Sequence, residues 1–197
     1  DAYKSIESRL AAITTASAAL ERASGWNVRA ASTSNATIAT AIAAAGATLG
    51  SVQFTVDRLA TTHGVATATD VASTSSVVAS GGTVRIHVAG TDHDIAVGAG
   101  TLSEVATAIN DAGIGVRAAI VNTGTGHRLQ LTAASSGAAN EFSVTSGLDV
   151  ATAVTTQAVD AKLRFGSGPG AYDVTSATNV FADVLGGVTI TAKTVST

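Results

Sequence analysis

Residues 84–113 have the sequence VRIHVAGTDHDIAVGAGTLSEVATAINDAG, in which the hydrophobic period changes partway along. Apolar and polar residues alternate in 84–88 and again in 93–97, with a turn at Gly90 between them. This period of two predicts a pair of half-buried strands. Beyond them the apolar residues stand at i, i+3, i+4 and i+7, namely Leu102, Val105, Ala106 and Ile109. That spacing predicts a helix with one apolar face.

The predicted helix has recognisable signals at both ends. Thr101 can cap its first turn, and Glu104 can reach back to the Thr101 amide, which together form a capping box. Gly113 suits the left-handed residue that ends such a helix. Two further strands are predicted at 116–121 and 128–132. The stretch therefore predicts a ββαββ-like unit in which one helix lies on a small sheet and buries a modest core.

This unit resembles the flagellar hook IN motif, a repeat named for an Ile-Asn pair, here Ile109-Asn110. Four other segments carry the resemblance: TLSE at 101–104, GVRA at 115–118, RLQLTA at 128–133 and GAAN at 137–140. The sequence on either side of the unit is the test of this resemblance.

The composition limits the size of the core. Of the 197 residues, 46% are hydrophobic but only 4% are aromatic, and alanine supplies much of the apolar content. A core of Ala, Val and Ile gains less free energy per residue than one of Leu and Phe, because it buries less apolar area. We therefore expect small sandwich-like layers in one or two domains rather than one large core.

Charge, hydropathy and cysteine content exclude several classes of protein. The net charge is −3 and 13% of residues are charged, so the sequence carries no basic footprint for nucleic acid or an anionic membrane. No apolar run approaches the roughly 18 residues that cross a bilayer, and no signal peptide is recognisable. Cysteine is absent, which excludes disulfides, zinc–thiolate sites and a cysteine nucleophile.

The first residues predict a long helix with a narrow apolar seam. A spacing of three and four residues relates Tyr3, Ile6, Leu10, Ile13 and Leu20. The helix is expected to run to about Ser24 and to end at Gly25. A seam of this kind is typical of a coiled coil and needs a partner, yet the sequence predicts no second long helix. We expect the partner in missing sequence or in another molecule; the alternative is that the helix lies on a neighbouring sheet.

Strand-rich blocks flank the central unit on both sides. The expected strands are 37–43, 52–56, 161–165, 172–174 and 188–192, with a hairpin turn over Gly166–Gly170. The segments 61–76 and 146–156 are expected to be connections, and 180–185 a short helical turn. The simplest arrangement pairs the early strands with the late ones, so that the central unit is inserted between them.

The predicted fold class is α+β, with two small strand-rich head domains on part of an N-terminal helical stalk. The expected divisions are a stalk helix at 1–25, a discontinuous head domain at 26–75 and 157–197, and an inserted head domain at 76–156. The chain starts at Asp1, without methionine and inside the predicted helix, so we expect it to be a piece of a longer protein.

The flanks strengthen the resemblance. Residues 50–60 (GSVQFTVDRLA) resemble the early head-domain strand of bacterial flagellar filament cap proteins, the hook-associated protein 2 or FliD type. Residues 157–161 (QAVDA) and 176–190 (SATNVFADVLGGVTI) resemble the later signature of that family. The turn Gly166–Gly170 is longer than the short hairpin usual in the family, so the local geometry there is expected to differ.

The resemblance implies a structural role without a cofactor. The family forms a homo-oligomeric cap at the distal tip of the flagellum, outside the cell, and promotes the folding and insertion of exported flagellin. Its members leave the cell through the flagellar export channel. The implied partners are flagellin, the hook-associated junction proteins, further copies of the chain and, for an exposed head, host-surface glycans. Nucleic acid and membrane are not among them.

The residues suggest no enzyme. Asp92, His93, Asp94 and His87 are the only cluster of metal-ligand types, but neighbours on a strand point to opposite faces, so a solvated hairpin is the better interpretation. The glycine-rich stretches at 124–126 and 166–170 lack the following helix of a phosphate loop. We therefore predict no catalytic, cofactor-binding or metal-ligating residue.

Two alternatives stay open from the sequence. One is another hook-associated or flagellin-like structural protein that carries the same inserted motif. The other is an adhesive carbohydrate-binding module, which needs an aromatic platform. Besides four phenylalanines the sequence offers only Tyr3, Tyr172 and Trp26, none of them clustered, and Trp26 is expected to pack at the junction of stalk and head.

Overall fold

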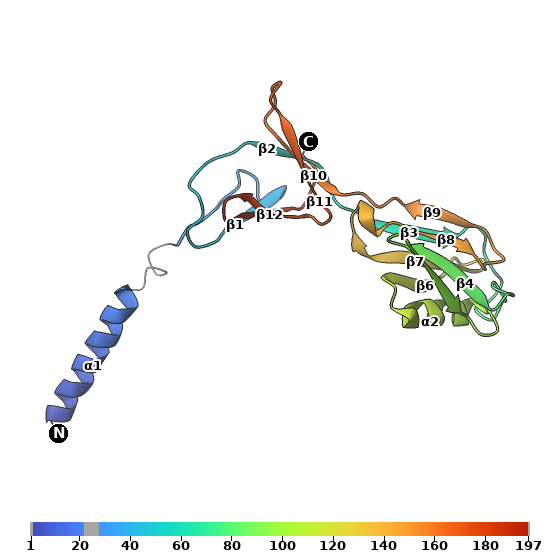
Figure 1. Ribbon diagram of the computed structural model, residues 1–197, viewed down its shortest axis with the longest axis horizontal. Helices are drawn as coiled ribbons and strands as arrows, with labels where there is room; N and C mark the ends of the chain where they lie inside the picture. Colours follow the sequence, from blue (N-terminus) through green and yellow to red (C-terminus); the bar gives the residue numbers. More distant parts are fainter. Residues whose placement is uncertain (1, 22–27, 197) are drawn as a thin grey trace. The chain divides into compact units, whose positions relative to one another are not determined.

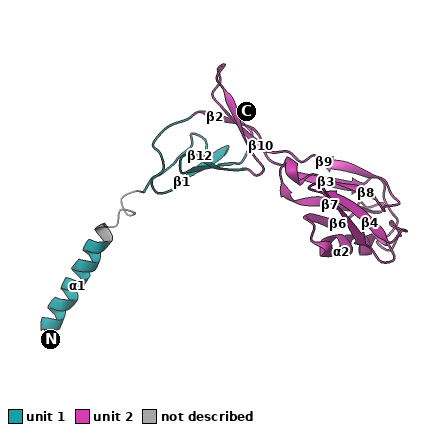
Figure 2. Ribbon diagram, viewed as in Figure 1, with its two compact units in different colours: residues 1–52, 180–193 teal, residues 53–179, 194–197 magenta. Residues whose placement is uncertain are grey.

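The computed structural model of the chain describes residues 2–21 and 28–196 (Figure 1). It confirms the α+β class, because strands make up 44% of the structure and helices 17%. The described part divides into two compact units (Figure 2). The first unit comprises residues 1–52 and 180–193, and the second comprises residues 53–179 and 194–197. The expected helix end at Ser24 and Gly25, and the expected packing of Trp26, lie outside the described residues.

The first unit contains one helix and one antiparallel sheet. Helix α1 spans Ala2–Glu21, and the sheet has the order β1-β13-β12. Its strands are β1 (Ala39–Ala43), β12 (Val180–Leu185) and β13 (Val188–Ala192). The pairing of β1 with β13 joins an early strand to a late one, as expected.

The helical turn expected at 180–185 is wrong, because these residues form strand β12. Phe181 lies opposite Ile190, and both are buried. Asp183 has a positive φ of 53° and its Oδ1 accepts a hydrogen bond from the Gly187 N–H at 2.6 Å. The register shifts between Phe181 and Leu185, and this irregularity hides the alternation that would have identified a strand.

The second unit begins with a sheet of three antiparallel strands in the order β11-β10-β2. These are β2 (Phe54–Arg58), β10 (Ala161–Phe165) and β11 (Tyr172–Ser176). The expected hairpin across Gly166–Gly170 is confirmed, since β10 pairs with β11. The pairing of β2 with β10 again joins the early block to the late one.

The rest of the second unit contains two further sheets and helix α2. The four-stranded sheet has the order β6-β7-β3-β9, with β3 (Thr62–Thr67), β6 (Val116–Asn122), β7 (His127–Ser136) and β9 (Thr152–Thr156). The three-stranded sheet has the order β5-β4-β8, with β4 (Thr83–Val88), β5 (Thr91–Ala96) and β8 (Phe142–Ser146). Helix α2 spans Leu102–Ala112, and a short 3-10 turn, η2, spans Ala138–Asn140.

The expectation of one small sheet beneath the helix is therefore wrong. The four predicted strands form with helix α2 in the expected order, but they belong to two different sheets. The connection expected at 61–76 is also wrong in its first part, because β3 is an inner strand of the four-stranded sheet. The connection expected at 146–156 likewise contains β9.

The sequence of β3 explains why periodicity missed it. Five of its six residues, His63 to Thr67, are buried, so the strand is covered on both faces and shows no alternation. Its small residues allow this close covering. A Cβ added at Gly64 would lie 2.7 Å from the Thr155 Oγ1 on the neighbouring strand β9.

Helix α2 closes the core as its sequence predicts. Leu102, Val105, Ala106 and Ile109 are all buried. The capping box between Thr101 and Glu104 is present, and Gly113 has the left-handed conformation, with φ of 61°. The loop before the helix is held tightly, because a Cβ added at Gly100 would lie 2.1 Å from the Ala79 carbonyl oxygen.

Candidate functional site

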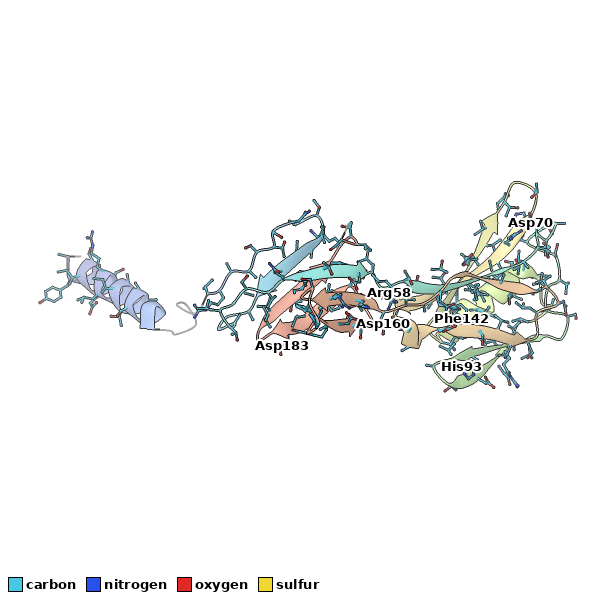
Figure 3. All side chains as sticks on the ribbon, turned by 90° about the horizontal axis from the view of Figure 1, so that it is seen from above. Arg58, Asp70, His93, Phe142, Asp160 and Asp183 are labelled. Atoms are coloured by element: carbon cyan, nitrogen blue, oxygen red, sulfur yellow. The ribbon has the colours of Figure 1, made fainter. Side chains whose placement is uncertain are left out.

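The hairpin that carries the predicted metal-ligand types is an ion-paired surface. His87 lies opposite Asp92, with Nδ1 and Oδ1 2.6 Å apart, and Arg85 holds Asp94 through two nitrogens at 2.6 and 2.7 Å. The hydrogen bonds and charge of Arg85 lower the pKa of the Asp94 carboxyl. His93 lies opposite Ile86, off this row of pairs (Figure 3). Within the described residues, no three His, Cys, Asp or Glu side chains gather as a metal site.

Asp70 fixes the glycine-rich turn between β6 and β7. Its carboxylate accepts hydrogen bonds from the hydroxyls of Thr123 and Thr125, at 2.6 and 2.7 Å, and from the Arg128 Nε at 2.5 Å. These groups, the Thr123 hydroxyl first, hold the pKa of the Asp70 carboxyl well below its usual range. Gly126 leaves room for this contact, since a Cβ there would lie 2.9 Å from the Asp70 Cβ.

The Ile-Asn pair has a structural role. Ile109 is fully buried in the core beneath α2. The next side chain, Asn110, donates from Nδ2 to the Ala118 carbonyl oxygen at 2.9 Å and accepts at Oδ1 from the Ala118 N–H at 2.9 Å. Strand β6 is the edge of its sheet, so the Asn110 amide pairs with that edge as the backbone of a further strand would.

A hydrogen-bonded junction links the sheets of the second unit (Figure 3). Thr61, which lies between β2 and β3 in the chain, donates its N–H to the carbonyl oxygen of Val159 at 3.0 Å. Val159 lies between β9 and β10. The Arg58 Nε donates to the Asp160 carbonyl oxygen at 2.9 Å, and the Asp160 side chain accepts from the Ala138 N–H at 2.8 Å. The Asn179 Oδ1 accepts from the Ala60 N–H at 2.7 Å. The central sheets are thus tied to the three-stranded sheet from several elements.

The predicted seam residues lie on α1. Four of the side chains are exposed: Tyr3 by 85%, Ile6 by 56%, Leu10 by 57% and Ile13 by 66%. Leu20 belongs to the same helix, but its side chain lies outside the described part. Exposed apolar side chains on one helical stripe are what a helix without its partner presents. The packing role of this stripe stays a prediction.

An aromatic row is a feature that the sequence analysis missed. Phe54, Phe165 and Tyr172 lie opposite one another on β2, β10 and β11. The rings of Phe165 and Tyr172 are stacked, with centroids 5.3 Å apart, and those of Phe54 and Phe165 are 5.7 Å apart. Phe165 is buried, whereas Tyr172 is 60% exposed. The hairpin predicted from the sequence already placed Phe165 close to Tyr172, so its register could have revealed this aromatic pair.

Replacing Asn110 tests the closure of the β6 edge. In Asn110→Ala the Ala118 N–H and carbonyl lose both side-chain partners, which should cost about 1–2 kcal/mol of stability. Denaturant unfolding measures this loss, and hydrogen exchange should show faster exchange of the Ala118 amide. Asp111→Ala, at the exposed neighbouring position on α2, is the matched control. Equal stability of the two variants would contradict the role given to Asn110.

The Asp70 contacts predict a dependence of stability on acid. The pKa of the Asp70 carboxyl is depressed in the folded state, so the ionised carboxylate stabilises the fold at pH values above 3.8, the ordinary pKa of an aspartate. This stabilisation is lost as the pH falls below 3.8. Thermal unfolding between neutral pH and pH 2 should show a steeper decline for the wild type than for Asp70→Asn. Asp111→Asn should keep the wild-type slope. Parallel curves for the wild type and Asp70→Asn would refute this expectation.

Two family models match adjoining parts of the chain. The model for the flagellar hook-associated protein 2 N-terminus matches residues 1–63, and the model for the flagellin hook IN motif matches residues 64–135. A search of curated protein sequences finds no match. The two models together cover the helix, the early strands and the central unit through β7.

Solved structures of flagellar cap proteins are similar to the chain. The D1-D2-D3 domains of FliD from Escherichia coli match with 26% identity and a TM-score of 0.82, covering 100% of this chain and 60% of that one. The D2-D3 domains of the same protein match with 25% identity and a TM-score of 0.72, covering 82% and 91%. FliD (HAP2) from Pseudomonas aeruginosa PAO1 matches with 25% identity and a TM-score of 0.64, covering 81% and 80%.

The chain thus spans 60% of the length of the three-domain Escherichia coli structure, and in it the IN motif follows the hook-associated N-terminal region. Within the described residues no helix is long and apolar enough to cross a membrane. The family is one of structural proteins rather than enzymes. The two family models and the agreement in fold together support a cap protein of the flagellar hook-associated protein 2, or FliD, type.

Proposed function

We propose that this chain is the head and part of the stalk of a protein that caps the distal end of the flagellar filament. There it promotes the folding and insertion of exported flagellin, outside the cell and after export through the flagellar channel. The observation that carries the proposal is the match of the whole chain to a flagellar cap structure, with a TM-score of 0.82. The work is steric: surfaces contact incoming subunits, and no covalent step is needed.

The stripe on α1 supports the assembly part of the proposal. Ile6 and Leu10 are more than half exposed and lie one turn apart on the same face. In the full-length protein this stripe packs against further helical sequence or against another copy of the chain, as a coiled-coil seam does. We propose flagellin, further copies of the chain and the hook-associated junction proteins as the partners of the cap.

A complementation experiment tests whether the protein acts as the filament cap. Cells that lack the cap gene should secrete unpolymerised flagellin, and the full-length protein should restore filaments visible by electron microscopy. A version without residues 26–197 shows whether the head is needed for assembly. Normal filaments in cells without the protein would refute the proposed function.

The same experiment tests the seam. Ile6→Asp with Leu10→Asp places two charges on the stripe and should abolish filament restoration and assembly of the purified protein, measured by light scattering. Ser8→Asp with Ala12→Asp adds the same charges on the opposite face of α1 and should leave both unchanged. Equal behaviour of the two double variants would remove the seam from the proposal.

Adhesion to surface glycans is a second candidate function, favoured by the aromatic row. A stacked tyrosine that is 60% exposed offers a flat apolar surface of the kind on which a sugar ring packs. Binding to a glycan array should be lost in Tyr172→Ala and kept in Tyr3→Ala, which removes the exposed tyrosine of α1. Absence of glycan binding by the wild type would leave the row as a packing feature only.

A further inference from the structure

Strand β9 forms an unusually open edge of the four-stranded sheet. It lies at the end of the order β6-β7-β3-β9, and among the described strands none pairs with its outer side. Its sequence, Thr-Ala-Val-Thr-Thr, is rich in β-branched residues, and the last four of the five residues are exposed, including Val154 by 55%. From 150 to 159 the chain has no charged residue and no proline.

Four other edges of this unit, at β6, β2, β5 and β11, are closed or charged. The Asn110 side-chain amide hydrogen-bonds to the backbone of β6. On β2, the Val56 N–H donates to the Ser196 hydroxyl oxygen at 2.9 Å, and the Ser196 N–H donates to the Val56 carbonyl oxygen at 2.8 Å. Strands β5 and β11 carry ion-paired carboxylates, among them Asp94 and Asp173. These are the devices by which proteins prevent unwanted strand pairing.

Strand β8 is uncharged as well, but two of its five residues are buried or partly buried. Its first residue, Phe142, is buried and packs edge-on against the His63 ring with centroids 5.0 Å apart. Val144 is only partly exposed. Four of the five residues of β9 are exposed, compared with three of the five in β8.

An open edge of this kind binds through the main chain. Its unpaired N–H and C=O groups can hydrogen-bond to an added strand, and small side chains such as Thr and Ala form no pocket that would select a sequence. The edge is therefore suited to many different extended segments. A folded partner without a free strand of its own gains little from it.

The charges at the two ends of the edge restrict the occupant. Asp149 accepts a hydrogen bond from the Ser80 N–H at 2.6 Å, and Asp160 accepts one from the Ala138 N–H at 2.8 Å, so both carboxylates are held in place. Antiparallel pairing of β9 with the β9 of a second copy, centred on Val154, would bring Asp149 of one copy close to Asp160 of the other at both ends. Like charges so placed oppose self-pairing and also oppose an acidic segment.

We propose that the β9 edge binds an extended, uncharged stretch of unfolded polypeptide as a fifth strand of this sheet. The proposal rests on the proposed cap function, in which the unfolded chain is exported flagellin that has not yet folded. The edge holds a short segment in extended form and releases it when the segment finds its partners in the growing filament. Affinity is low, because few residues pair and ordering an unfolded chain costs free energy.

Peptide binding to the full-length protein tests this directly. The probe is a fluorescent peptide of about ten alternating threonine and valine residues, measured by fluorescence anisotropy. The same peptide N-methylated at alternate amides lacks the main-chain donors and should not bind. In Val154→Lys, and in Ala153→Lys on the other face of the strand, binding should weaken about tenfold or more.

The matched control is Val121→Lys. Val121 is 46% exposed on β6 at the opposite edge of the same sheet, so it adds the same charge to a strand that Asn110 already closes. It should bind the peptide as the wild type does. No binding by the wild type, equal binding by Val154→Lys, or binding of the N-methylated peptide would each overturn the proposal.

Two further measurements distinguish peptide binding at β9 from a contact between copies of the chain and from a failure of the proposed cap function. If Val154→Lys lowers the oligomeric state in light scattering without changing peptide binding, β9 is a contact between copies and the proposed occupant is wrong. Filament restoration is scored in parallel with the same variants. Failure of the wild type to restore filaments refutes the cap function, whereas restoration by the wild type without peptide binding refutes only the role of β9.

Discussion

The second unit depends on one hydrogen-bonded ladder that passes through the junction at Thr61 and Val159. Two antiparallel segments, β2–β3 and β9–β10, run from the three-stranded sheet into the four-stranded sheet. The bridge between Thr61 and Val159 keeps the two segments paired where they pass from one sheet to the other. The chain therefore enters and leaves the central sheets through neighbouring, paired strands. Gly137 lets the end of β7 approach this junction, since a Cβ there would lie 2.8 Å from Ala177.

The ladder also shows where sequence reasoning succeeded and where it failed. The α2 helix, its capping box and the β4–β5 hairpin were predicted correctly, because each is amphipathic and local. Strand β3 was missed because burial on both faces removes the alternation, and β9 because an exposed edge strand of Thr and Ala carries no apolar face. Strands β3 and β9 pair with each other in this ladder, so hydrophobic periodicity could not predict how the strands are arranged in the four-stranded sheet.

The candidate site follows the same division. The Ile-Asn pair could be recognised in the sequence, but the pairing of Asn110 with Ala118 depends on how α2 lies against β6. The aromatic row required the register of β2 with β10, which are separated by about a hundred residues. The stripe on α1 was visible from its spacing alone and is exposed, whereas its packing against a partner stays a prediction.

An open strand edge has to be reconciled with solubility, because exposed uncharged edges are templates for aggregation. Three features limit this hazard for β9. The strand is short, and its register with β3 shifts between Gly64 and Val65, so the edge is not a long flat surface. Asp149 and Asp160 bound it at both ends, which disfavours stacking of one copy on another. An edge limited in this way can accept one short neutral segment without growing into a larger sheet.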